Sequence, residues 1–215
     1  MKHVFVESNW VYDYCSPQHL RKPDAEILVG RAARGEIVLH VPGICLREGA
    51  SSVRRKSQPK DADIKEFRRW AAQAGEITTE DATAAVRFLD RYRLRVTTDL
   101  NGINARLDAL IAGAGVETFS LNEAMLQRVL RLRGTVPEDA DLKPFDEAIL
   151  GAVIVRAEEL RGQGETEFWF CTLDSDLWPW TKDKKRRPGL ENLYRDAGFV
   201  DAQGDITVRS DFSVP

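Results

Sequence analysis

Apolar positions along the chain follow two patterns, short continuous runs and longer stretches with apolar residues every three to four positions. The short runs are rich in β-branched and aromatic residues, which is typical of buried strands. Such runs predict strands at residues 3–7, 37–41, 116–119 and 167–173, and a hairpin or edge strand at 199–208. The helical spacing predicts helices at 17–34, after Pro42, through most of 61–133, at 145–160 and just before Gly198.

Residues with special backbone chemistry indicate where several of these helices begin and end. Gly35 is expected to end the first long helix, and Pro42 to open the next, because proline lacks the N–H that is unpaired at a helix start. Thr79 precedes two acidic residues and is expected to cap a helix that reaches about residue 94. Ser120 with Glu123 has the spacing of a capping box. A loop is predicted over 134–143.

The order of the predicted elements indicates the fold class. Strands separated by helical segments imply parallel crossover connections, because neighbouring parallel strands need a long link between them. We therefore predict an α/β fold, a three-layer α/β/α sandwich with a mainly parallel central sheet. In such folds the ligand crevice lies at the carboxyl ends of the strands.

Composition excludes several classes of protein. The chain has 215 residues, 43% of them hydrophobic, and a net charge of −3, which excludes a disordered chain. Charged residues interrupt every apolar run well before about 18 residues, so we expect no membrane span. The N-terminus shows no signal-peptide pattern, and the three cysteines do not have metal-site spacing. We expect buried free thiols at Cys45 and Cys171 and a cytoplasmic protein.

The small net charge hides two basic islands, which are defined here as residues 47–69 and 181–187. The first island holds eight Lys/Arg against four acids, and the second holds five against one, so each carries a local charge of +4. Either these are solvated surfaces, or they attract a polyanion. We expect the nucleic-acid backbone to contact Arg54, Arg55, Lys56, Lys182, Lys184, Lys185, Arg186 and Arg187. Trp178 and Trp180 either stack on unpaired bases or, as we favour, cover the end of the sheet.

Carboxylates lie at the points where the topology would bring chain segments together. Glu7 ends the first predicted strand, and Asp174 and Asp176 end the last strong one. Glu48 lies in the helix after the second strand, and Asp146 in the first turn of the helix after Pro144. Each acid alone fits an ordinary role as a turn, surface-pair or helix-start residue. Their joint placement predicts an acidic pocket.

Such a pocket requires a cation. Two carboxylates about 4 Å apart repel by about 4 kcal/mol at an effective dielectric of 20, so four cannot all stay ionised alone. Oxygen ligands without nearby His or Cys favour Mg²⁺ or Mn²⁺. Such an ion binds a phosphate oxygen and activates water, so the predicted chemistry is phosphodiester hydrolysis.

These residues resemble, in order, the four motifs of PIN-domain nucleases. The first motif is an acid that ends strand one with Asn two residues later, and the second is a Glu in the helix after strand two. The third is an Asp that opens a helix, and the fourth is Thr-x-Asp-x-Asp before an apolar residue. The matching segments are Val4–Asn9, Pro42–Glu48, Leu142–Leu150 and Thr172–Leu177.

The resemblance implies a PIN-like sandwich and Mg²⁺- or Mn²⁺-dependent cleavage, with RNA a more plausible substrate than DNA. It implies metal ligation by Glu7, Glu48, Asp146 and Asp174. It makes Asp176 an auxiliary acid in the catalytic set, and Asn9 and Thr172 supporting hydrogen-bonding residues. Many small relatives are VapC-type toxins of toxin–antitoxin modules, so it also implies an antitoxin protein and a homodimer as possible partners.

The chain departs from the family pattern in two places. The family's first acid is usually Asp, whereas this chain has Glu7, whose extra methylene shifts the carboxylate by about 1 Å or more. Glu48 and Asp146 are also farther apart in sequence than a compact toxin requires. We therefore interpret residues 1–215 as a single PIN-like domain with a helical insertion at about 55–113. The alternative to a nuclease is a catalytically weak PIN-like module that binds RNA or a protein.

Overall fold

The computed structural model describes residues 1–58, 61–73, 78–132 and 142–215, and their centre is a parallel five-stranded sheet. The strand order is β3-β2-β1-β4-β5, and every pair of neighbours is parallel. The strands are β1 (Lys2–Val6), β2 (Ile37–Pro42), β3 (Val116–Phe119), β4 (Glu167–Cys171) and β5 (Val208–Arg209). The predicted α/β class with a parallel central sheet is therefore confirmed.

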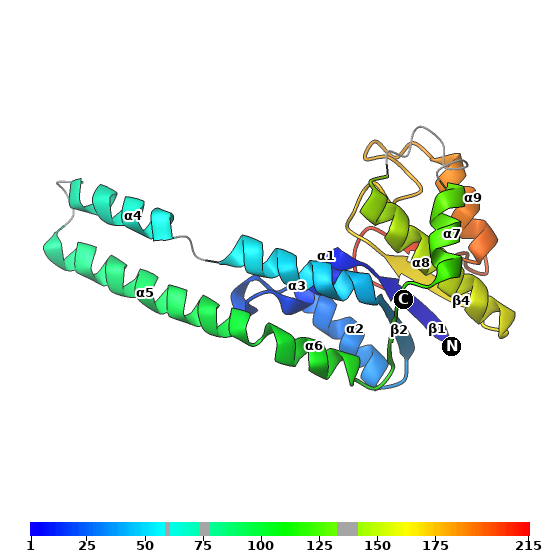
Figure 1. Ribbon diagram of the computed structural model, residues 1–215, viewed down its shortest axis with the longest axis horizontal. Helices are drawn as coiled ribbons and strands as arrows, with labels where there is room; N and C mark the ends of the chain where they lie inside the picture. Colours follow the sequence, from blue (N-terminus) through cyan, green and yellow to red (C-terminus); the bar gives the residue numbers. More distant parts are fainter. Residues whose placement is uncertain (59–60, 74–77, 133–141) are drawn as a thin grey trace.

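Helices cover the sheet on both sides (Figure 1). On one side lie α1 (Ser8–Cys15), α2 (Pro23–Ala33), α3 (Gly43–Ser57) and α6 (Ile103–Ile111), with the short 3-10 helix η1 (Gln18–Leu20) between α1 and α2. On the other side lie α7 (Glu123–Leu132), α8 (Pro144–Gly162) and α9 (Pro188–Ala197). This arrangement is the three-layer sandwich expected of parallel crossovers.

Buried aromatic side chains hold one face of the sheet against α9. Phe5 and Phe168 lie on neighbouring strands, and both contact Phe199, with ring centroids 5.5 and 6.0 Å apart. Tyr194 of α9 packs edge-on against Phe199 and contacts Phe170 of β4. These five aromatic side chains have no exposed surface or almost none. Buried aromatic area of this size fixes the helix on the sheet and therefore fixes the loop that precedes it.

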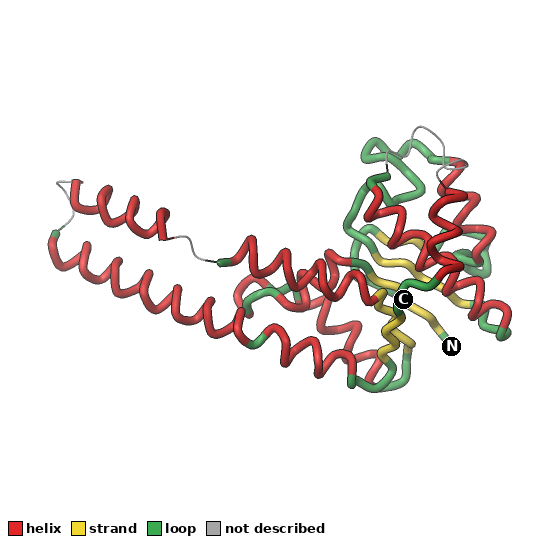
Figure 2. The backbone as a smooth tube through the Cα atoms, viewed as in Figure 1, coloured by secondary structure: helices red, strands yellow, loops and turns green. Residues whose placement is uncertain are grey.

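The helical region predicted at about 55–113 contains α4 (Asp61–Gln73), α5 (Thr79–Asn101) and α6. In Figures 1 and 2, α4 and α5 run side by side and extend away from the sheet as a two-helix arm. The prediction that this helix ends at about residue 94 is wrong, because α5 continues to Asn101. At the other end, the cap of α5 is Thr78 rather than the predicted Thr79, because the Thr78 side chain accepts a hydrogen bond from the amide of Asp81.

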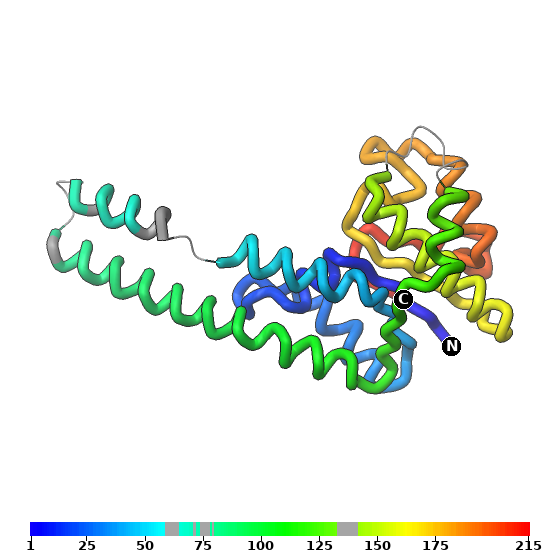
Figure 3. Tube along the Cα trace, viewed as in Figure 1, coloured from blue at the N-terminus to red at the C-terminus, as the bar shows by residue number. Residues whose placement is uncertain are grey.

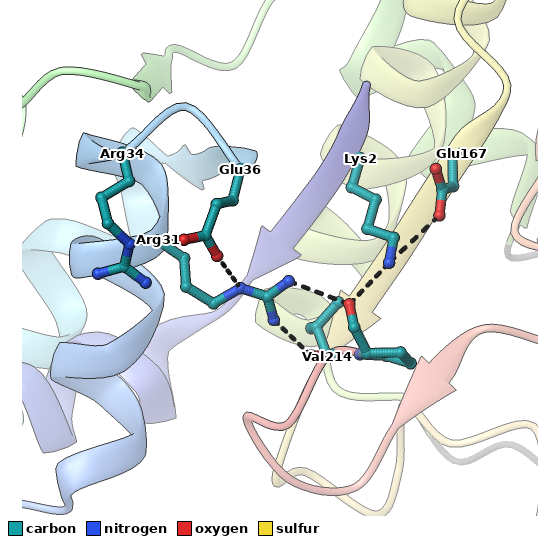
Figure 4. A network of polar contacts seen from close by, with 7 residues as sticks. Lys2, Arg31, Arg34, Glu36, Glu167 and Val214 are labelled. Atoms are coloured by element: carbon teal, nitrogen blue, oxygen red, sulfur yellow. Dashed lines mark hydrogen bonds and ion pairs between the residues drawn. The ribbon is translucent and has the colours of Figure 1, made fainter.

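The carboxyl-terminal residues are held between α2 and the first strand (Figure 4). Arg31 donates to the carbonyl oxygens of Val214 and Pro215, and Lys2 donates to that of Pro215 at 2.7 Å. Lys2 also lies 3.6 Å from the carboxylate of Glu167. These contacts join β1, β4 and α2 at the end of the sheet where the strands begin.

Other local predictions have mixed outcomes. Cys45 and Cys171 are buried free thiols as predicted, and so is Cys15. Helix α7 is capped by Asn122 rather than by Ser120, because the Asn122 side chain accepts from an amide in the first turn. The segment 199–208 forms a single antiparallel bridge and then the edge strand β5. The loop predicted over 134–143 lies almost wholly outside the described residues.

One further property concerns membranes. Within the four described ranges, no helix combines the length and the apolar character that a bilayer crossing requires. The predicted cytoplasmic location stays a prediction.

Candidate functional site: carboxylates at the ends of the strands

The carboxyl ends of β1 and β4 bring two distant chain segments together. In the parallel register Val6 pairs with Cys171, so Glu7 and Thr172 leave the sheet at the same edge. Figure 3 shows these neighbours as the blue and yellow strands, which are far apart in the sequence and side by side in space. The candidate site therefore lies where parallel α/β folds place their ligand crevice.

Glu7 lies at the base of this site and is only 2% exposed. It is the N-cap of α1, and its Oε2 accepts a hydrogen bond from the amide of Asn9 at 2.6 Å. Its Oε1 accepts from the amide of Leu173 at 3.3 Å. Burial raises the pKa of Glu7 from 4.5 to about 7; the hydrogen bonds from Asn9 and Leu173 oppose this rise, and the nearby charge of Asp174 adds to it.

The loop after β4 is organised by its own side chains. Thr172 Oγ1 accepts from the amide of Asp174 at 3.0 Å, and Asp174 Oδ1 accepts from the amide of Asp176 at 2.9 Å. Trp178 donates its indole N–H to the carbonyl of Thr172 at 2.9 Å. Tyr194 of α9 donates to the carbonyl of Leu177 at 2.8 Å. Both acids are half-buried and held on a braced turn.

Asp146 faces this loop from the first turn of α8. Burial is the largest cause that raises its pKa from 3.8 to about 6, and the charge of Asp174 is the second. The charges of Asp176 and Glu48 raise this pKa further, while Lys143 lowers it. Three carboxylates from two other segments of the chain therefore act on Asp146 electrostatically.

Close packing of two helices positions Glu48. At the next residue, Gly49, a Cβ atom would lie 2.6 Å from Cβ of Val11, so only glycine lets α3 approach α1 this closely. The buried Cys45 links Glu48 to the base of the site. The pKa of its thiol is raised by burial first, and then by the charges of Glu7 and Glu48. Electrostatic effects on Glu7, Cys45 and Asp146 thus link the five predicted acids, which are called the acidic set below.

A metal site is not preformed by these side chains. Among the residues that the structure describes, no three His, Cys, Asp or Glu side chains are grouped closely enough to hold an ion. The predicted metal ligation by Glu7, Glu48, Asp146 and Asp174 stays a prediction. The donor atoms available, carboxylate oxygens without a nearby imidazole, are those that Mg²⁺ and Mn²⁺ prefer.

Arg187 has a role that the sequence analysis missed. It was expected to bind nucleic acid, but it is half-buried, and its Nη1 donates to the carbonyls of Ser175, Asp176 and Trp178 at 2.9 to 3.4 Å. It therefore braces the turn that carries the acids. The signal in the sequence was indistinguishable from that of the exposed basic residues beside it.

The other residues of the second basic island remain on the surface. Lys182, Lys184 and Lys185 are exposed at a tight turn, and Arg186 is 82% exposed while it contacts Glu191 at 3.3 Å. The turn directly continues the loop of the two acids. Its cations are thus available to a polyanion near the site.

The three residues of the first basic island that were expected to contact nucleic acid lie in the last turn of α3, which points toward the arm (Figure 1). Arg54 donates to the side chain of Asn104 at 2.6 Å, and Arg55 contacts Ser52 at 3.4 Å. Lys56 lies over the ring of Tyr12 at 5.0 Å. All three cations are exposed and each has a partner within the protein.

Comparison of the chain with protein-family models, with curated proteins and with solved structures gave no match. The family of the chain is therefore not identified by similarity, and the PIN-domain resemblance rests on the motif residues alone.

Proposed function

We propose that this protein is a metal-dependent nuclease that hydrolyses phosphodiester bonds, with RNA as the preferred substrate. The observation that supports this is the parallel register of β1 and β4, which places Glu7 beside the turn that carries Asp174 and Asp176. Burial, and then the charges of Asp174, Asp176 and Glu48, raise the pKa of Asp146 next to this turn. Like charges held together in a half-buried site destabilise the protein unless a proton or a cation compensates them. Perturbed carboxylates in a crevice are typical of functional sites.

The residues fit an oxygen-ligated cation. Glu48, Asp146 and Asp174 would hold Mg²⁺ or Mn²⁺ directly, and Glu7 would complete the set from below. Both Glu7 oxygens accept an amide hydrogen bond, and each retains a further lone pair. When bound, such an ion supplies Lewis-acid activation of the phosphate and of a water molecule.

The chain's own groups orient the reacting partners. Thr172 and Arg187 hold the backbone of the turn so that Asp174 and Asp176 keep fixed positions. Asp176 would accept the proton of the attacking water, because it belongs to the same electrostatic set and is not assigned to the ion. The exposed cations of the second basic island would bind the phosphates that flank the cleaved bond.

One observation favours the alternative of a non-catalytic module. Glu7 caps α1 and joins it to the end of β4 through two amides, and this structural role explains the residue without an ion. In that case the acidic pocket would bind a basic segment of a partner, or the protein would bind RNA without cleaving it. An antitoxin partner and a homodimer stay predictions from the resemblance.

The test compares cleavage of labelled RNA and DNA by the wild type and by Asp146→Asn, with Mg²⁺, Mn²⁺ or EDTA. We expect RNA cleavage that requires the ion and is abolished in the variant. The matched control is Asp24→Asn, since Asp24 is also in the first turn of a helix opened by proline, but it is exposed and outside the site.

The outcomes separate the two proposals. Cleavage that persists in EDTA and in Asp146→Asn would contradict the metal mechanism. RNA binding without any cleavage under all three conditions would favour the module. Loss of cleavage in Asp24→Asn as well would show that helix-end charge, rather than the acidic set, is responsible.

A further inference from the structure

A cavity lies next to the turn that carries the second basic island. Its volume is about 230 Å³, and it is lined by Pro179, Trp180, Arg186, Glu191, Arg195, Asp205 and Ile206. None of the five candidate catalytic acids lines it. The cavity therefore needs an explanation of its own.

The aromatic wall of this cavity is firmly supported. Trp180 packs against Trp178, with ring centroids 6.3 Å apart and an angle of 29° between the planes. Trp178 is in turn fixed by its indole hydrogen bond to the carbonyl of Thr172. Both tryptophans are half-buried and pack against the core, but only Trp180 lines the cavity.

The backbone around Trp180 is equally constrained. Trp180 and Arg186 form an antiparallel bridge, and the amide of Arg187 donates to the carbonyl of Pro179 at 2.8 Å. The turn between them places Lys184 in the left-handed region at φ 60°, which is uncommon for a residue with a side chain. Such a conformation persists only where surrounding contacts maintain it. The turn is therefore a fixed platform.

The polar groups of the cavity offer both donors and acceptors. Arg186 and Arg195 both contact the same carboxylate oxygen of Glu191, each at 3.3 Å. Arginine donors and a carboxylate acceptor beside a tryptophan match the edge and the face of a nucleobase, which carries acceptors and donors on its rim. The lysines of the adjoining turn match its phosphates.

The position of the cavity also fits a substrate. Pro179 is three residues after Asp176, so their Cα atoms are at most about 11 Å apart. A single strand with a phosphate at the acidic site would reach the cavity within a few nucleotides. A duplex would not, because its bases are stacked inside the helix.

We propose that this cavity is a nucleobase subsite, in which Trp180 stacks on an unpaired base of the strand that occupies the acidic site. This inference rests on the proposed function, because the acidic site supplies the reason for a nucleic acid to lie here. It makes single-stranded RNA, or an unpaired loop, the substrate class. It also makes Trp180 a specificity-determining residue.

The test measures binding in EDTA, where cleavage does not interfere, with a fluorescent single-stranded oligoribonucleotide and a duplex of the same sequence. Stacking of one base is worth about 1–3 kcal/mol, so we expect Trp180→Ala to weaken single-strand binding by about 5- to 150-fold. Trp180→Phe should restore much of the affinity, whereas Trp180→Leu, which keeps an apolar side chain, should not. Trp70→Ala is the control, since Trp70 is 60% exposed on the arm.

Each outcome bears on the subsite. Unchanged single-strand affinity in Trp180→Ala, or an equal loss for the duplex, would overturn it, and so would a wild type that binds no oligonucleotide. If binding depends on Trp180 but no RNA is cleaved with Mg²⁺ or Mn²⁺, the subsite stands and the nuclease proposal fails. If RNA is cleaved but Trp180→Ala binds it normally, the nuclease proposal stands and the subsite proposal fails.

Discussion

Two polar clusters lie on the same sheet, and they differ in whether the protein supplies partners for their charged or polar groups. The acidic set gathers like charges at the strand ends. The second cluster is a buried histidine pair on β1 and β2, in which His3 Nδ1 and His40 Nε2 are 2.8 Å apart. Its two ends lie beside carboxylates, since Glu165 lies 3.0 Å from His3 and Glu117 lies 3.4 Å from His40.

The histidine cluster is compensated within the protein. Every ring nitrogen faces another ring or a carboxylate, although the two outer contacts are ion-pair contacts rather than aligned hydrogen bonds. Arg156 of α8 joins the chain of contacts, 3.1 Å from Glu117. Burial, with smaller contributions from His3 and Arg156, lowers the pKa of His40 to about 3, so this ring is neutral at pH 7.

The difference indicates which cluster serves stability and which serves function. The histidine pair has carboxylate neighbours within the fold, Glu117 of β3 and Glu165 just before β4. Within the described residues, no ion pair joins one of the five acids to a lysine or arginine, and Lys143 acts on Asp146 only by lowering its pKa. Carboxylates that have no cation partner within the protein are available to bind a cationic ligand, and such groups are typical of functional sites.

The largest effect expected from this comparison is on activity. Asp174→Asn removes one charge from the acidic set but keeps an oxygen able to accept the amide of Asp176. We expect cleavage to fall by more than the roughly 10- to 100-fold that follows loss of an outer-shell metal partner. Unfolding of the metal-free variant by denaturant should show no loss of stability at pH 7. A variant that is inactive because it is less stable would contradict the comparison.

The next effect is on the pH dependence of stability without metal. Glu7 has a raised pKa of about 7 in the folded protein, so the folded state binds a proton that the unfolded chain releases above about pH 4.5. Stability contributed by this proton is present at pH 4.5 and is lost as pH rises to about 7, by about 3 kcal/mol at most. Urea unfolding at pH 5 and pH 8 should show a larger fall in the wild type than in Glu7→Gln, where the smaller contribution of Asp146, whose pKa is raised to about 6, remains.

His40 changes stability in the opposite direction over an overlapping range. Its folded pKa is lowered to about 3, so the unfolded chain binds the proton first as pH falls below about 6.5. Stability from the neutral ring is present above pH 6.5 and declines toward pH 3. The two slopes are therefore separable by their variants, since Glu7→Gln removes only the first and His40→Phe only the second.

The sequence allowed us to predict the five acids as one site, but it gave no indication that His3 and His40 pair. Elements with strong periodicity, such as β4 and α8, were predicted within a few residues, and the acids followed from where strands end. Contacts that join distant segments were not predictable. The close approach at Gly49, the inward guanidinium of Arg187 and the pairing of His3 with His40 depend on packing that no local pattern records.

A smaller effect is expected when the compensated cluster is broken. His40→Phe keeps the ring stack on Phe5, whose centroid is 4.7 Å away, but it leaves His3 without its 2.8 Å partner. An unpaired buried polar group costs about 1–3 kcal/mol, and the free energy of unfolding should fall by that amount with cleavage unchanged. The control is His19→Phe, because His19 is exposed and its ring contacts the ring of Tyr92, away from the histidine pair. Loss of cleavage in His40→Phe would show that the two clusters are coupled.

The smallest expected effect is on stability and concerns Glu7. This residue belongs to the acidic set, but it also caps α1 and accepts hydrogen bonds from two backbone amides. Glu7→Asp keeps the charge but shortens the side chain by one methylene, so its carboxylate cannot reach the amides of both Asn9 and Leu173 as it does now. Loss of one such hydrogen bond should lower stability by about 1 kcal/mol. If Glu7 also holds the ion, the Mn²⁺ concentration for half-maximal cleavage should change in the variant. If that concentration is unchanged while stability falls, Glu7 is a cap alone, and the ion is held by Glu48, Asp146 and Asp174.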